Sequence, residues 1–279
     1  MQYQSTLRSA VCFEGPGLHT GVHCRAEILP AVPDSGIRFV TEDVVIPALS
    51  EYVVETARAT VLGRSGVAIS TVEHLLAALL GIGVSNAEIR VQGPEIPVAD
   101  GSAHTFAARI AQSGIVSQSE PRARFVATAP SFVRDGDRAV IALPAAAFRI
   151  RFLADFPPPI GTQYFDGEIT PATFTREVAA ARTFGYLHEV ETLRRRGLAQ
   201  GGTLENAVVF APEGPMQELR WPNEPVRHKV LDLLGDFALL GAWPQCEVIA
   251  IKSGHKLHCI VTNDLRRQMR QELPPASVR

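Results

Sequence analysis

The feature that most constrains the fold is a strongly apolar segment at residues 226–240, in which His228, Asp232 and Asp236 stand among valine, leucine and phenylalanine residues. A helix that is apolar on nearly all sides is buried in the interior of a protein. Because a buried polar group is costly without a partner, these three residues need partners from elsewhere in the chain. The segment therefore predicts a central helix with a polar site beside it.

His228 and Asp232 are four residues apart, so they lie on one face of this helix, and Asp236 continues the same face. By this spacing one helix can supply two ligands to a zinc ion. The alternative interpretation is a solvent-facing polar stripe with an ordinary pair one turn apart.

A second helix is predicted at residues 70–80, where Glu73 and His74 are neighbours in the first turn and point about 100° apart. Glu73 could instead complete a capping box with Ser70, and His74 could be an ordinary core histidine. Together with His228 and Asp232, however, His74 gives two imidazoles and one carboxylate. Three protein ligands that leave one position for water are typical of a catalytic zinc site.

The remaining polar groups match amide hydrolysis. Glu73 adjoins a ligand and can act as general base, while His255, in the Lys252–His255 turn, can stabilise an oxyanion or protonate the leaving amine. Asp236 could keep His255 charged and oriented. His258 is expected on a following strand, where we interpret it as structural.

Alternating short strands and helices indicate an α+β protein. We expect two similar domains, residues 1–118 and 119–279, divided in the polar stretch 117–124. Each contains a β-sheet with two helices, at residues 70–80 and 102–113 in the first and at residues 171–180 and 226–240 in the second.

Composition excludes several classes of function. Formal net charge is −2 and the longest basic run is Arg194–Arg196, so no nucleic-acid partner is expected. No stretch approaches the ~20 apolar residues of a membrane span, and the first residues lack a signal segment. Four widely separated cysteines predict free thiols in a reducing compartment. We expect a cytoplasmic, monomeric protein that does not span a membrane.

Several motifs in order along the chain resemble the UDP-3-O-acyl-N-acetylglucosamine deacetylases (the LpxC family) of lipid A biosynthesis. They are GLHTG at 17–21, STVEHL at 70–75, PEIP and DGSA within 94–103, ARTFG at 181–185, GGT at 201–203, HKVLD at 228–232 and KSGH at 252–255.

The resemblance implies a role for each matching residue. The metal ligands would be His74, His228 and Asp232, holding Zn²⁺, although Fe²⁺ suits the same ligands. The catalytic residues would be Glu73 as base, His255 as acid, Asp236 as its partner, and Thr183 as donor to the carbonyl oxygen. Contacts to the UDP-linked acyl-glucosamine substrate would come from Phe184, Lys229, Glu189 and Lys252.

The resemblance also implies a β-α-α-β sandwich whose helices meet at the centre, and an insert at about residues 182–210 that forms a passage for the acyl chain. Tyr186, Leu187, Val190 and Leu198 suit such a passage, although an amphipathic helix packed on the body is the alternative. The expected reaction is zinc-dependent hydrolysis of the substrate's N-acetyl group. The short, proline-rich loop at 155–160 leaves open a related deacetylase that acts on another nucleotide sugar. A non-catalytic zinc-binding regulator is the third hypothesis.

Overall fold

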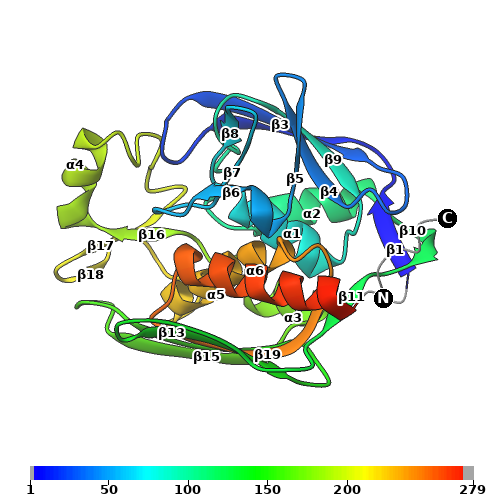
Figure 1. The fold of residues 1–279 in the computed structure, drawn as a ribbon. Helices are drawn as coiled ribbons and strands as arrows, with labels where there is room; N and C mark the ends of the chain where they lie inside the picture. Colours follow the sequence, from blue (N-terminus) through cyan, green and yellow to red (C-terminus); the bar gives the residue numbers. More distant parts are fainter. Residues whose placement is uncertain (1–2, 273–279) are drawn as a thin grey trace.

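The computed structural model describes residues 3–272 and contains two main β-sheets with helices between them (Figure 1). The first sheet has the order β2-β3-β9-β4-β5. Its strands are β2 (Val11–Pro16), β3 (His23–Pro30), β9 (Ala87–Gln92), β4 (Ile37–Thr41) and β5 (Val44–Pro47). Every neighbouring pair is antiparallel except β4 and β9, which are parallel.

The second sheet repeats this arrangement in the order β12-β13-β19-β14-β15, with β11 also paired to β19. The strands are β11 (Arg124–Val126), β12 (Ser131–Asp135), β13 (Arg138–Pro144), β14 (Arg149–Asp155), β15 (Thr162–Glu168) and β19 (Trp243–Ile251). The central strand β19 is antiparallel to β13 and parallel to β14, as β9 is to β3 and β4. The two halves therefore share one strand order that has no counterpart in a visible sequence repeat.

Smaller elements complete the first half. A three-stranded sheet is formed by β6 (Val53–Glu55), β7 (Val61–Arg64) and β8 (Val67–Ile69), after the short 3-10 helix η1 (Ser50–Tyr52). Strand β1 (Tyr3–Leu7) pairs with β10 (Ile115–Pro121), so β10 crosses the expected boundary at residue 118 while still paired to the first half. The division into domains stays a prediction.

The helices lie between the sheets, as Figure 1 shows for α1 (Glu73–Ile82), α5 (Glu224–Ala238) and α6 (His255–Glu272). The other helices are α2 (His104–Ser113), α3 (Pro171–Glu177) and α4 (Leu187–Arg195). All residues of α1 are buried, and most of α5 is buried as well. The expected α+β sandwich with central helices is confirmed, but α6 is a helix that the sequence analysis did not predict.

The insert projects from one side of this body (Figure 1). It consists of α4 and a small sheet of β16 (Phe184–Tyr186), β17 (Val208–Ala211) and β18 (Gly214–Pro215). All four cysteines are free, as expected. Within residues 3–272, no helix has the length and apolar character needed to cross a membrane.

Candidate active site

The site lies where α1 packs against α5. Gly235 of α5 sits against the backbone of Glu73, and a Cβ at Gly235 would lie 2.1 Å from the Glu73 carbonyl oxygen. This position is glycine because any side chain would separate the two helices. The close approach places the first turn of α1 beside the middle of α5.

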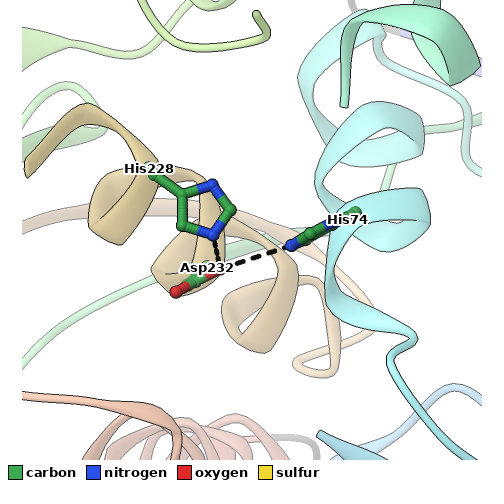
Figure 2. A group of neighbouring side chains, drawn as sticks. All are labelled: His74, His228 and Asp232. Atoms are coloured by element: carbon green, nitrogen blue, oxygen red, sulfur yellow. Dashed lines mark ion pairs between the residues drawn. The ribbon is translucent and has the colours of Figure 1, made fainter. Parts of the chain in front are cut away.

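The three expected metal ligands meet at this contact, His74 from α1 and His228 and Asp232 from α5 (Figure 2). Asp232 Oδ1 lies 3.2 Å from His228 Nε2 and 3.8 Å from His74 Nε2. One ligand atom from each residue falls within 4.8 Å of the other two, and all three side chains are buried. His74 thus meets two residues that follow it by more than 150 positions in the chain, and a single ion could touch all three.

Their protonation states suit a divalent cation. His228 Nδ1 lies 3.0 Å from the Ala181 carbonyl oxygen, which can only accept, so Nδ1 carries the proton and Nε2 keeps a lone pair. Burial lowers the pKa of His228, and burial together with His228 lowers the pKa of His74 to about 3. Burial alone would raise the pKa of Asp232, but His228 and Lys229 outweigh it and hold this pKa below its ordinary value. Two neutral imidazoles and one carboxylate are the donor set of a catalytic metal site.

Glu73 is free to act beside these ligands. Helix α1 begins at Glu73, and no side chain caps it, so the capping box with Ser70 is not formed. Glu73 Oε2 accepts a hydrogen bond of 3.1 Å from the Thr60 backbone, and Oε1 lies 3.7 Å from His255 Nε2. Burial raises the Glu73 pKa to about 7, although His255 opposes the rise. A carboxylate with a pKa near neutrality can both take and return a proton.

His255 lies across the site from Glu73, and a buried carboxylate keeps its imidazole protonated. Its Nδ1 donates to Asp236 Oδ2 over 2.8 Å, and Asp236 is wholly buried. Burial would lower the pKa of His255, but the Asp236 carboxylate outweighs it and raises this pKa to about 9. At neutral pH His255 is therefore an imidazolium that directs Nε2 towards the reaction centre, 4.0 Å from Asp232.

The expectation that His258 lies on a strand is wrong. Helix α6 begins at His255, so His258 lies one turn further along the same helix and on the same face. It is fully buried, and its Nδ1 lies 2.9 Å from Asp236 Oδ2. Asp236, His255 and His258 form a second cluster of potential ligands, but the two contacts to Asp236 have the lengths of hydrogen bonds. The three-residue spacing of His255 and His258 is the helical signal in the sequence.

A cavity of about 570 Å³ runs from this centre into the insert. Its lining includes seven of the residues expected to bind substrate or carbonyl oxygen: Thr183, Phe184, Tyr186, Leu187, Glu189, Val190 and Lys229. It also includes apolar residues that the sequence analysis missed, Leu18, Leu193, Leu204, Val209 and Met216. These come from several separate elements, and no local pattern joins them. Leu198 is not among the lining residues.

The first half closes the cavity together with the insert. Backbone amides of Gln200 and Gly201 donate to the carbonyls of His19 and Leu18 over 3.0 and 3.1 Å. Arg58, from the loop before β7, lies 3.8 Å from Glu189 on α4. The apolar passage is thus bordered by both halves of the chain.

Lys252 lies in a separate hollow of about 200 Å³ that Lys229 and Phe156 also line. Its Nζ is bound to Asp155 and Asp137 over 2.7 and 3.1 Å. Lys229 and Phe156 line both cavities. Lys229 also reaches the candidate metal centre, because its Nζ contacts Asp232 over 2.6 Å. Lys252 is set apart from the catalytic cavity by this arrangement.

Comparison with known proteins agrees with the geometry. Residues 4–267 match the family model described as UDP-3-O-acyl N-acetylglycosamine deacetylase. UDP-3-O-acyl-N-acetylglucosamine deacetylase of Myxococcus xanthus is 44% identical over 98% of this chain and 90% of its own length. The protein of the same name from a Nostoc species is 44% identical over 91% of this chain and 95% of its own. The chain belongs to the UDP-3-O-acyl N-acetylglycosamine deacetylase family.

Proposed function

We propose that this protein hydrolyses the N-acetyl group of UDP-3-O-acyl-N-acetylglucosamine and releases acetate and a free amine, a step of lipid A biosynthesis. The observation that carries the proposal is the meeting of a free carboxylate, Glu73, and an imidazolium, His255, at a candidate metal centre that opens into an apolar cavity. The relatives that match the chain carry the name of this activity.

His74, His228 and Asp232 would hold the metal, for which Zn²⁺ is our first choice because two imidazoles and a carboxylate with an open position suit it; Fe²⁺ suits the same donors. When bound, the cation supplies Lewis-acid polarisation of the amide carbonyl and makes water more acidic. Metal analysis of the purified protein distinguishes the two ions.

The protein's own residues supply the proton transfers. Ionised Glu73 takes a proton from the water that attacks the acetyl carbon. His255, kept charged by Asp236, stabilises the oxygen as it becomes negative, and Thr183, which lines the cavity, would donate a second hydrogen bond. As the C–N bond breaks, the leaving nitrogen takes a proton from His255 or from Glu73, and the amine departs.

The substrate's other groups fit the surroundings of this centre. The apolar side chains of α4 and β17 would receive the acyl chain, and Phe184, which lines the cavity, would contact the sugar. Lys229 and Lys252 line the neighbouring hollow and would meet the nucleotide, together with Glu189 from the lining of the catalytic cavity. That the protein is a monomer stays a prediction. A cytoplasmic location stays a prediction.

The decisive assay is release of acetate from UDP-3-O-acyl-N-acetylglucosamine by the zinc-loaded protein. We expect turnover with this substrate and much slower turnover with the compound that lacks the 3-O-acyl chain. Equal rates on the two compounds would refute a working acyl passage, and no turnover by folded, zinc-loaded protein would refute the function.

A further inference from the structure

The Asp236 carboxylate, which orients His255, is also hydrogen-bonded by a second imidazole, that of His258. Asp236 Oδ2 lies 2.8 Å from His255 Nδ1 and 2.9 Å from His258 Nδ1. The other oxygen, Oδ1, accepts a hydrogen bond of 2.5 Å from the Thr60 hydroxyl. Asp236 and His258 are both wholly buried, so water cannot replace any of these donors.

The far side of the His258 ring is also bound. Nε2 lies 2.9 Å from the hydroxyl of Ser253, in the turn that leads into α6. Because the Asp236 carboxylate can only accept, His258 Nδ1 must carry a proton, and a neutral ring then leaves Nε2 to accept from Ser253. Burial lowers the pKa of His258 although Asp236 opposes it, which is consistent with a neutral ring.

A neutral donor has a particular effect on Asp236. It fixes the position of Oδ2 without cancelling the negative charge, so that the charge stays available to His255. The edge-on contact of His258 with the Phe152 ring, 6.1 Å between centroids, holds the imidazole from a third side. The ring is thus located by a hydroxyl, a carboxylate and an aromatic side chain.

We propose that His258 is a positioning residue for deacetylation, which holds Asp236 Oδ2 in line with His255 Nδ1 and thereby keeps the His255 imidazole aimed at the reaction centre. His258 touches no reacting atom and lines neither the catalytic cavity nor the Lys252 hollow. The inference rests on the proposed function, because it concerns the rate of that reaction.

The test compares His258→Leu, His258→Asn and His258→Gln in the zinc-loaded enzyme. Leucine has no donor, so kcat should fall about tenfold or more, in the range seen when groups that orient active-site ligands are removed, while KM stays within about twofold. The asparagine amide nitrogen occupies nearly the place of histidine Nδ1 and should restore most of kcat. The glutamine amide nitrogen lies nearer the place of Nε2 and should not.

Thr262→Val provides the matched control. Thr262 lies one turn further along α6, is wholly buried, and its hydroxyl has no hydrogen-bond partner among residues 3–272, so valine removes no contact. Its kcat should equal that of the wild type, and thermal melting of each variant reports the fold. If the leucine variant does not fold, the kcat values of the asparagine and glutamine variants still test the role of His258.

Three outcomes would overturn the inference: an unchanged kcat in His258→Leu, an equal loss in Thr262→Val, or equal rates in the asparagine and glutamine variants. Inactive wild-type enzyme would instead refute the proposed function. Active wild type with any of the three outcomes would refute only the role of His258.

Discussion

At the scale of single residues, the site depends on two groups that face each other with opposite protonation requirements. In the proposed mechanism Glu73 must be ionised to accept a proton and His255 must be charged to give one, and the two side chains approach to 3.7 Å. Burial moves the pKa of Glu73 up to about 7, and Asp236 moves the pKa of His255 up to about 9. Between these values both groups are in the working state.

A bell-shaped dependence of kcat/KM on pH follows from this arrangement. Activity should fall as pH drops through the Glu73 pKa, at about 7 or lower because a bound cation favours the carboxylate, and fall again as pH rises through about 9. In His255→Ala the residual activity should lose the alkaline limb. A variant profile that keeps this limb would remove His255 from the proton transfer.

Glu73→Gln should abolish turnover without releasing the metal. Glutamine has the shape of glutamate and can still accept from the Thr60 amide, but it cannot take a proton from water, so kcat should fall about 10²–10⁴-fold. Metal content, measured on the purified variant, should match the wild type because Glu73 is not a ligand. His74→Ala is the contrasting variant, since it should lose metal and activity together.

At the scale of elements, the contact of α1 with α5 sets the distance between base and ligands. Gly235→Ala would place a methyl group 2.1 Å from the Glu73 carbonyl oxygen, and neither helix backbone can move without disturbing the core. We expect a loss of about 1–3 kcal/mol in unfolding free energy together with reduced kcat. Thermal melting and the acetate assay measure the two effects. Gly235→Ser should have a larger effect on both, and a wild-type melting curve for either variant would contradict the packing.

The insert helix α4 offers a prediction about substrate choice. Val190 lines the cavity, whereas the neighbouring Glu191 side chain is 81% exposed and does not. Val190→Trp should block the passage, so that the rate falls steeply with acyl-chain length while short-chain substrates are still deacetylated. Glu191→Trp adds a similar bulk on the outer face of the same helix and should leave the chain-length profile unchanged. If both variants behave alike, α4 does not bound the acyl passage.

Some helices of the protein can be predicted from the sequence and others cannot, for physical reasons. Helices α1 and α5 are predictable because α1 is apolar after its first turn and the apolar residues of α5 recur around its polar ones. The polar residues of such a buried helix need partners, which predicts the site. Helix α6 is not predicted because polar residues such as Lys256 and Asn263 interrupt its apolar residues. His258 was assigned to a strand from alternation alone. The passage wall was only partly predictable, since Leu18 and Met216 join it through tertiary contacts.

At the scale of the whole molecule, two halves with the same strand order form one site between them. The first half supplies Glu73 and His74, and the second supplies His228, Asp232 and His255. The approach of the halves is therefore a condition for assembling the site. An ion that binds ligands from both halves should in turn stabilise their association.

Metal removal should therefore destabilise the entire protein as well as inactivate it. Binding to the folded state alone adds RT ln(1 + [L]/Kd), about 2.7 kcal/mol at a free metal concentration of 100 times Kd, and the unfolded chain cannot bring His74 to Asp232. A chelator should lower the melting temperature by about 5 °C or more, since 1 kcal/mol corresponds to roughly 2–4 °C in a chain of this size. Added zinc should restore both melting temperature and activity. The melting temperature of His74→Ala should be the same with and without chelator. If the chelator lowers the melting temperature of this variant as much as that of the wild type, it acts at another site.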